Sequence, residues 1–396
     1  MLTPSTSWLR LAPLAGLVLL LAACDSGDGS SLYDPDAGTN PAPVISSVSP
    51  DGVVLAGVDV VVIEGQNFSD DPALNTVVFD DANGSAAPGE VLSATPTRLE
   101  VRVPNLPNPA LRVRVAVIGA QDYSNAVALP LTPAFVSFGE ISRTEVPYGI
   151  AADADGTLYL SLENEGASVG VIEIGPDGTR SPYFASTFPW AALARGGDQL
   201  FGVRRVRAVF ELPEGGSQTV LAAFQPTSLL LAAVAATPDG AVYAGGNAPT
   251  LYRVSADGTA SDTAFPANIR ALAVVDGTLY AVGAGGTGAP DQLYTVPLAA
   301  DGTPGTPQAL AALPAVGTAL AVAADGTVYV GLDRTTDPIV TVAPNGQVEV
   351  LYPGVLSGPI NSLAYGAGTQ LYAVREAADG EPADVLRVET RREGAR

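Results

Sequence analysis

The chain has 396 residues and a formal net charge of −22, although only 15% of its residues are charged. It contains no histidine and no lysine, which excludes Ser-His and Cys-His catalytic arrangements, His-ligated zinc, a Schiff-base lysine and the lysine of a phosphate loop. The acidic balance also argues against nucleic acid as a partner, because a negative field repels polyanions.

The N-terminal segment has the pattern of a signal peptide. Residues 11–21 form an apolar run after Arg10 that is too short for a permanent membrane span. The run ends in Leu21-Ala22-Ala23-Cys24, which resembles a bacterial lipobox. This resemblance implies that residues 1–23 are a lipoprotein signal peptide and that Cys24 carries a lipid that anchors the protein to a membrane outside the cytoplasm. An ordinary secretory signal with an incidental cysteine is the alternative.

A polar segment follows the lipobox. Residues 24–42 are rich in Gly, Ser and Pro and lack a strand pattern, so we expect a flexible tether between the membrane and the folded part. Cys24 is the only cysteine of the chain. Since lipidation consumes its thiol, no disulfide is expected even in an oxidising compartment.

Short apolar segments separated by turn residues fill residues 43–131. In residues 98–103 and 111–117, charged residues alternate with Leu or Val, which predicts strands with one buried and one solvated face. About seven short strands in about 90 residues match the size of an immunoglobulin-like sandwich.

The same segment resembles the IPT/TIG family. The motifs that carry the resemblance are Ile45-x-x-Val48-x-Pro50, Gly65-x-Asn67-Phe68, Val77-x-Phe79, Ala94-Thr-Pro-Thr-x-Leu99 and Ser124-Asn125-Ala126. We expect positive φ angles at both Gly65 and Asn67, since both residue types tolerate a tight corner. The resemblance implies a spacer or a protein-binding module. Its occasional role in contacting DNA conflicts with the acidic balance.

Residues 134–396 contain one pattern six times. In each copy an apolar strand is followed by a Gly-containing turn and by a second strand with an aromatic residue, and this aromatic recurs roughly every 40 residues, the length of a propeller blade. The recurring aromatics are Tyr159, Phe201, Tyr243, Tyr280, Tyr329 and Tyr372. The predicted fold is therefore all-β, an immunoglobulin-like β-sandwich followed by a six-bladed β-propeller.

Each blade is expected to contain four strands joined by tight Asp-Gly hairpin turns. In the first blade these strands are predicted at 150–152, 158–162, 169–174 and 180–183. The last blade ends near 384–388 without a clear fourth strand. Residues 134–138 precede the first blade and are expected to supply it, because closing the ring leaves no open sheet edge.

The propeller segment also resembles NHL-type propellers and the related gluconolactonase-like family. The resemblance rests on Pro147-x-Gly-Ile-Ala-x-Asp153, on the Asp-Gly-x-Leu-Tyr turns and on Leu251-Tyr-Arg-Val254. Lactonases of that family hold a divalent metal with carboxylate and Asn ligands. Those ligands have no one-to-one counterparts here, so no catalytic residue, metal ligand or cofactor is assigned.

Topology predicts which face of the propeller would bind a ligand. All Asp-Gly turns should lie on one face, and the variable loops between second and third strands on the other, where recognition is expected. The candidate binding residues are Glu163, Trp190, Arg204, Asn247, Asn268, Arg270, Asp333 and Asn361. An aromatic ring with amides and Arg suits a sugar or an acidic peptide. An ordinary solvated rim is the alternative, and Trp190 could equally fill the core between blades.

These features predict a lipid-anchored binding protein of the bacterial cell envelope, with a protein or glycan ligand and no catalysis. One alternative is a metal-dependent hydrolase or lactonase that uses Glu163, Asn247, Asn268 or Asp333 around the channel. Another is a purely architectural component of an envelope assembly.

Overall fold

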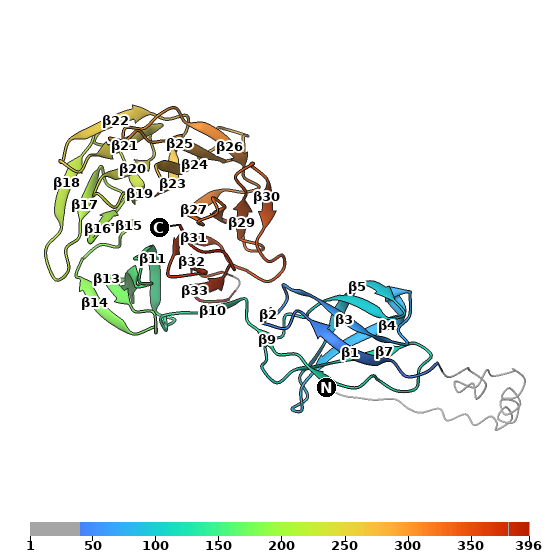
Figure 1. The fold of residues 1–396 in the computed structure, drawn as a ribbon. Coiled ribbons are helices and arrows are strands. Elements are labelled where there is room, and N and C mark those ends of the chain that lie inside the picture. Colours follow the sequence, from blue (N-terminus) through green and yellow to red (C-terminus); the bar gives the residue numbers. More distant parts are fainter. Residues whose placement is uncertain (1–39, 379, 396) are drawn as a thin grey trace, which may run out of the picture.

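The structure is a computed structural model that describes residues 40–378 and 380–395. The predicted signal peptide, Cys24 and most of the predicted tether lie outside the described residues. Within the described part every regular element is a β-strand, apart from the short 3-10 helix η1 (Pro72–Leu74). None of the described helices is long and apolar enough to cross a membrane. Figure 1 shows a β-sandwich beside a ring of six sheets.

The sandwich consists of nine strands. They are β1 (Val44–Ser49), β2 (Val54–Leu55), β3 (Val60–Gln66), β4 (Asn75–Asp80), β5 (Ala86–Thr95), β6 (Arg98–Arg102), β7 (Arg112–Val117), β8 (Val127–Ala128) and β9 (Leu131–Thr132). Strand β5 serves both layers, because its first half pairs with β4 and its second half with β6. Gly89 lies at this crossing, where a Cβ atom would come within 2.6 Å of Val101 and 2.7 Å of Phe79.

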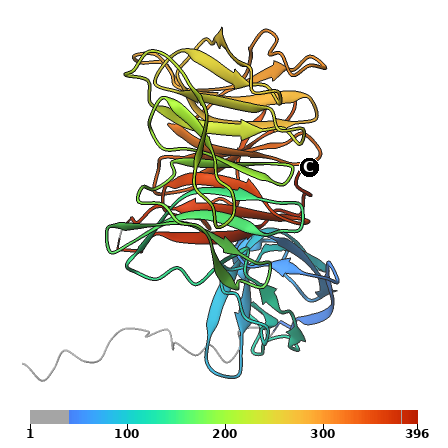
Figure 2. The ribbon, with the colours of Figure 1, turned by 90° about the vertical axis from the view of Figure 1, so that its left-hand side faces the viewer.

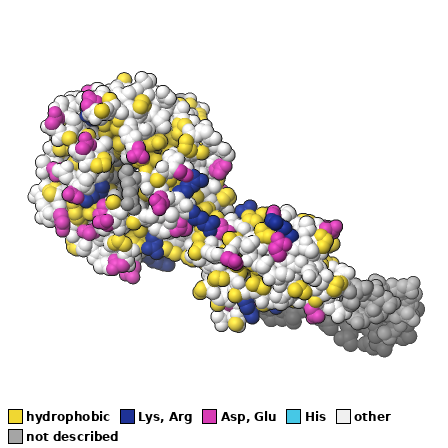
Figure 3. All heavy atoms as spheres, viewed as in Figure 1, with side chains coloured by type: hydrophobic (Ala, Val, Ile, Leu, Met, Phe, Trp, Pro, Cys, Tyr) yellow, Lys and Arg dark blue, Asp and Glu magenta, His cyan; other side chains and the backbone are white. Residues whose placement is uncertain are grey.

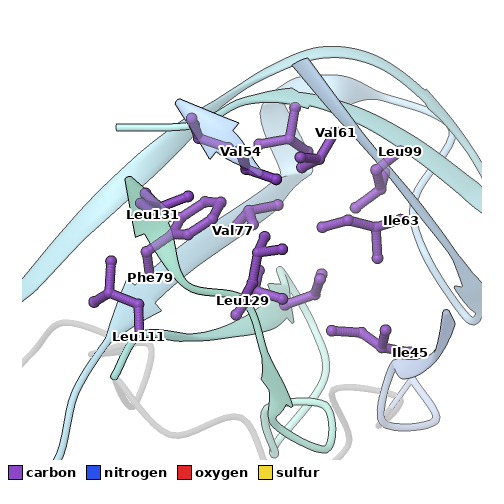
Figure 4. Packing of buried hydrophobic residues seen from close by; sticks show 14 of the residues in the cluster. Ile45, Val54, Val61, Ile63, Val77, Phe79, Leu99, Leu111, Leu129 and Leu131 are labelled. Carbon is purple, nitrogen blue, oxygen red and sulfur yellow. The ribbon is translucent and has the colours of Figure 1, made fainter. Parts of the chain in front are cut away.

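The predicted alternation in the sandwich strands is confirmed. Leu99, Val101, Val113 and Val115 are fully buried, and the arginines between them face solvent or ion-pair partners. Figure 4 shows Val61, Ile63, Leu99 and Phe79 among the side chains that meet between the layers. Each such side chain contributes about 1.5–3 kcal/mol through burial.

The corner after β3 is only partly as predicted. Asn67 has the expected positive φ of 64°. Gly65 does not have a positive φ, so that expectation was wrong. A glycine is required at this position for a different reason. A Cβ atom there would lie 2.0 Å from the carbonyl oxygen of Val44 and 2.4 Å from the ring of Phe68.

The propeller has six four-stranded blades, which we number 1 to 6 in chain order. Blade 1 contains β11 (Glu145–Ala152), β12 (Leu158–Asn164), β13 (Ala167–Ile174) and β14 (Arg180–Phe184), in agreement with the predicted strands. Blades 2 and 3 contain β15 (Ala192–Gly196), β16 (Gln199–Val203), β17 (Ala208–Glu211), β18 (Thr219–Ala223), β19 (Leu231–Ala236), β20 (Val242–Gly246), β21 (Thr250–Val254) and β22 (Ala260–Ala264). Blades 4 and 5 contain β23 (Ile269–Val275), β24 (Thr278–Gly283), β25 (Gln292–Pro297), β26 (Gln308–Ala312), β27 (Gly317–Val322), β28 (Val328–Leu332), β29 (Ile339–Val342) and β30 (Val348–Val350).

Blade 6 closes the ring in the predicted way. Its strands β31 (Ile360–Tyr365), β32 (Gln370–Arg375) and β33 (Asp384–Glu389) come from the end of the chain, and its outer strand β10 (Phe135–Ser137) comes from before blade 1. Phe135 pairs with Val388 and Ser137 with Leu386. Both ends of the propeller segment are therefore held in one sheet.

The Asp-Gly turns differ among blades. In blade 4, Asp276 and Gly277 both have positive φ, at 47° and 72°, as a two-residue hairpin turn requires. In blade 1 that prediction was wrong, because the N–H of Asp153 bonds to the carbonyl of Thr157 and only Gly156 has positive φ. This wider loop is a turn followed by a glycine bulge, and the Asp153 carboxylate accepts N–H groups within it.

We call the face with the loops between first and second strands the turn face, and the opposite face, with the loops between second and third strands, the rim face. Figure 2 shows the propeller edge-on, with the sandwich beyond its lower edge. The two parts meet where Arg391 donates to both carboxylate oxygens of Asp59, at 2.9 and 2.6 Å, and to the Val53 carbonyl at 3.2 Å.

Candidate functional site

A β-bulge positions one side chain of each of four blades at the rim face. In the innermost strands of blades 3 to 6, one residue is skipped in the pairing with the second strand, and these residues are Ala232, Arg270, Thr318 and Asn361. In blade 1 the irregularity falls at Tyr148 and Gly149. Bulges re-aim side chains at the ends of sheets, so the fold presents a different residue in nearly every blade at this rim position.

The rim position surrounds a small cavity of about 60 Å³. Arg270, Thr318 and Asn361 line it together with Ala191 and Ala232. Its inner limit is a ring of aliphatic side chains, each at most 8% exposed, that also lines a cavity on the turn side. The ring consists of Ile150, Leu193, Val234, Leu272, Leu320 and Leu363.

Arg270 is held in place from one side. Its Nε atom lies 3.2 Å from Oδ2 of Asp291, which is buried and also accepts the N–H groups of Gly285 at 2.7 Å and Gly317 at 3.0 Å. The Arg270 side chain is still 43% exposed. One buried carboxylate thus joins blades 4 and 5 and leaves a positive charge at the surface.

Asn361 and Thr318 are the polar neighbours of Arg270 in the rim-side cavity. The Oδ1 atom of Asn361 is buried and has no hydrogen-bond partner among the described residues. The Thr318 hydroxyl donates to the carbonyls of Gly331, at 3.0 Å, and Ile360. Of these two side chains, Asn361 therefore has hydrogen-bonding capacity to spare.

Tyr148 and Glu163 form a pair on blade 1. The phenol of Tyr148 donates a hydrogen bond to Oε2 of Glu163. Burial, together with this acceptor, raises the pKa of Tyr148 to about 12, because the phenolate would lose water beside a carboxylate. Tyr148 therefore stays a neutral donor.

Trp190 is buried, which corrects its prediction as a binding residue. It lies one residue before the rim position of blade 2, is 0% exposed, and packs edge-to-face on Phe210 with ring centroids 5.4 Å apart. Its backbone N–H donates to Ser161 at 2.8 Å. Arg204 covers this cluster, with its guanidinium carbon 4.7 Å from the ring centroid of Phe188 and 4.8 Å from that of Phe210. Burial lowers the pKa of Arg204.

The remaining candidates are dispersed. Asn247 is exposed, and its amide ties its loop to the segment before β19 by accepting from Leu230 at 2.8 Å and donating to Ser228 at 3.3 Å. Asn268 and Asp333 are also exposed, and their hydrogen bonds to other residues are made by their backbone groups. No group of three or more acidic side chains in the described part of the chain could hold a metal ion.

The larger cavity lies on the turn face, opposite the face on which the sequence predicts recognition. It measures about 630 Å³ and is lined at the ends of the innermost strands by Asp153, Arg195, Thr237, Asp239, Asp276, Tyr365 and Ala395, among others. One sequence signal did point to it. Arg195 and Tyr365 stand at the strand-end position where the other four repeats have Ala or Val.

Comparisons with known proteins match the sandwich to a described domain and find several similar solved structures. A model described as the IPT/TIG domain matches residues 43–130. No curated protein matches the chain. Similar solved structures include a structural genomics protein of unknown function from Bacteroides thetaiotaomicron, at 16% identity and a TM-score of 0.48, covering 90% of this chain and 99% of that one.

Two further similar structures are a chain of the mitotic checkpoint complex and the computationally designed Ika8 protein. The first has 14% identity and a TM-score of 0.45, covering 94% of this chain and 98% of its own. The second has 13% identity and a TM-score of 0.37, covering 89% and 100%. The chain thus joins an immunoglobulin-like IPT/TIG domain to a six-bladed β-propeller.

Proposed function

We propose that this protein is a lipid-anchored binding protein of the bacterial cell envelope. In this proposal Cys24 carries the anchor, the IPT/TIG domain acts as a spacer, and the rim face of the propeller recognises a protein or a polysaccharide. The observation that carries it is the bulge at the rim position, which places unlike side chains of a repeated scaffold at the rim-side mouth of the channel.

The geometry of the rim face favours a large ligand over a small one. Its cavity of about 60 Å³ is far below the roughly 300–1,000 Å³ of small-molecule pockets. Arg270 on blade 4, Arg204 on blade 2 and the Tyr148–Glu163 pair on blade 1 come from three different blades, and of these residues only Arg270 lines the cavity. A polymer or a protein surface can contact several of them at once.

Glycan and peptide arrays, probed with the fragment 40–396, test the recognition part of the proposal. We expect ligands that the wild-type fragment binds and that Arg270→Ala together with Asn361→Ala weakens about tenfold, as for central interface residues. Arg102→Ala, at an exposed arginine of the sandwich, is the matched control and should bind normally. An array without hits, or hits that the double variant retains at full strength, would contradict the proposal.

The anchor has a separate test in the full-length chain. Cells expressing it are fed an alkynyl fatty acid, and the purified protein is examined for the label and for partition into detergent. We expect label on the wild type and none on Cys24→Ser, because a thioether needs the thiol. Label that survives the substitution, or its absence from the wild type, would refute lipidation at Cys24.

A further inference from the structure

The turn-side cavity already holds an extended segment of the chain along one wall. Near the C-terminus the backbone runs beside β27 of blade 5, where the N–H of Ala324 donates to the Glu393 carbonyl at 2.8 Å and that of Ala395 to the Val322 carbonyl at 3.0 Å. Ala395 also lines the cavity. The inner edge of a propeller strand can thus accept a peptide by strand addition.

The same segment places a guanidinium on a turn carboxylate. Arg392 Nη1 lies 2.7 Å from Oδ2 of Asp325, in the turn of blade 5, and also donates to the Thr327 hydroxyl. Burial opposes ionisation of Asp325, but hydrogen bonds from Thr327 and the charge of Arg392 hold the pKa of Asp325 below its usual value. Blade 5 therefore binds both the backbone and a basic side chain of an extended segment.

Blades 3 and 4 carry turn carboxylates without such a partner. Asp239 stands at the same turn position as Asp325, and Asp276 precedes the glycine of the shorter turn of blade 4; both line the cavity and are exposed. In the described part of the chain neither side chain makes an ion pair or a hydrogen bond. The innermost strands β19, β23 and β27 are neighbours in the ring, so the turns that carry Asp239, Asp276 and Asp325 follow one another on the turn face, and the first two of these residues line the cavity.

The surroundings favour a cationic occupant. Figure 3 views the propeller from the turn face, where more acidic than basic side chains are visible. The carboxylates of the turn-face loops include Asp153, Asp155, Asp177, Asp198, Asp239, Asp257, Asp276, Asp301 and Asp325. Arg195 lines the cavity as well, but its guanidinium lies 4.8 Å from the Tyr159 ring centroid and donates to the Asp198 carbonyl at 2.8 Å. It is held against the wall.

We propose that the turn-side cavity binds a basic, extended segment of a partner protein, whose Arg or Lys side chains pair with Asp239 and Asp276. The contact of blade 5 with the chain's own segment is the model for this interaction. The cavity, of about 630 Å³, is large enough for a short peptide. The site is on the face opposite the one proposed for the main ligand and does not depend on it.

Fluorescence anisotropy tests the proposal with a labelled Gly-Arg-Gly-Arg-Gly-Arg peptide, a citrulline version of the same peptide, and spermine as a competitor. The variant Asp239→Asn/Asp276→Asn removes both carboxylates, and Asn tolerates the positive φ at residue 276. The control Asp51→Asn/Asp122→Asn makes the same change in net charge at exposed residues of the sandwich.

We expect the arginine peptide to bind the fragment 40–396 and the citrulline peptide not to bind. Loss of two exposed ion pairs should weaken binding about tenfold in the double variant, with little change in the control. Equal weakening in both variants would show attraction by net charge alone and overturn the site. Failure of the arginine peptide to bind, or spermine binding with the same affinity and the same dependence on the variant, would also overturn it.

Discussion

Along each innermost strand neighbouring residues point to opposite sides, and in blade 2 this places Trp190 in the core and the next residue at the rim. We predict that Trp190→Ala lowers the free energy of unfolding by about 3–5 kcal/mol, because it leaves a cavity beneath Phe210 and Arg204. Chemical denaturation of the fragment 40–396 measures the loss. Phe188→Ala, at a ring that is 55% exposed, should cost far less, and equal losses would contradict the burial argument.

A second prediction concerns pH and the buried ion pair of blade 1. Hydrogen bonds from Arg180, at 2.6 and 3.1 Å, lower the pKa of Glu145 below its ordinary value against the opposing effect of burial. A carboxyl whose pKa is lower in the folded state stabilises the fold above its unfolded pKa, and this contribution is lost as the pH falls through the folded value. Wild type should therefore exceed Glu145→Gln in stability at pH 7.

The test is a series of denaturation curves between about pH 7 and about pH 3 for both proteins. The gap in unfolding free energy between wild type and Glu145→Gln should be largest near neutral pH and should narrow as the pH falls and the Glu145 carboxyl takes up a proton. A gap that does not change with pH would show that Arg180 does not stabilise the ionised Glu145.

At the scale of elements, β10 decides whether the ring is closed. It covers the outer edge of β33, and Phe138 follows it to donate its N–H to the Val385 carbonyl at 2.8 Å. We predict that the fragment 139–396, which lacks β10, self-associates and melts at a lower temperature than the fragment 133–396, because an open edge strand pairs with other chains. Light scattering during size-exclusion chromatography measures the first effect and calorimetry the second.

The comparison of these two fragments isolates the strand, since both lack the sandwich. If 139–396 remained monomeric with an unchanged melting temperature, the closure would contribute nothing to the stability of the propeller. The short length of β10, three residues, makes its contribution depend on the buried ring of Phe138, which packs on Tyr372 with centroids 5.0 Å apart.

At the scale of the whole molecule, one ion pair among the described residues links the two parts of the chain, with Arg391 exposed and Asp59 largely covered. The hydrogen bond with Asp59 raises the pKa of Arg391 and keeps the guanidinium charged. We predict that Arg391→Ala increases the radius of gyration of the fragment 40–396 in X-ray scattering, since the sandwich then moves more freely. High salt should shift wild type in the same direction but by less, because salt screens a partly covered ion pair only in part.

Arg392→Ala is the control for this prediction, because Arg392 pairs with Asp325 within the propeller. Its scattering curve should match that of wild type. If Arg391→Ala left the radius of gyration unchanged, the contacts beside the ion pair, such as the approach of Gly57 to Val355, would suffice to hold the two parts together.

Much of this architecture could be predicted because its signals are local and repeated. Alternation at Leu99 and Val101 specifies a half-buried strand wherever it occurs, and the recurring turns and aromatics mark six blades. The pairing of residues 134–138 with the last blade could also be predicted from the sequence. The last blade lacks a fourth strand and residues 134–138 form a strand outside the first blade, so the two must pair to close the ring.

The sequence by itself thus determined the fold class, the number of blades and the closure. Only the tertiary structure decided which side chains lie at the two mouths of the channel. The bulge at Arg270 and Asn361 and the burial of Trp190 depend on a shift of one residue, which local patterns do not resolve. The turn-side cavity unites strand ends such as Asp239 and Tyr365, far apart in the chain, so no single repeat contains the information that specifies it.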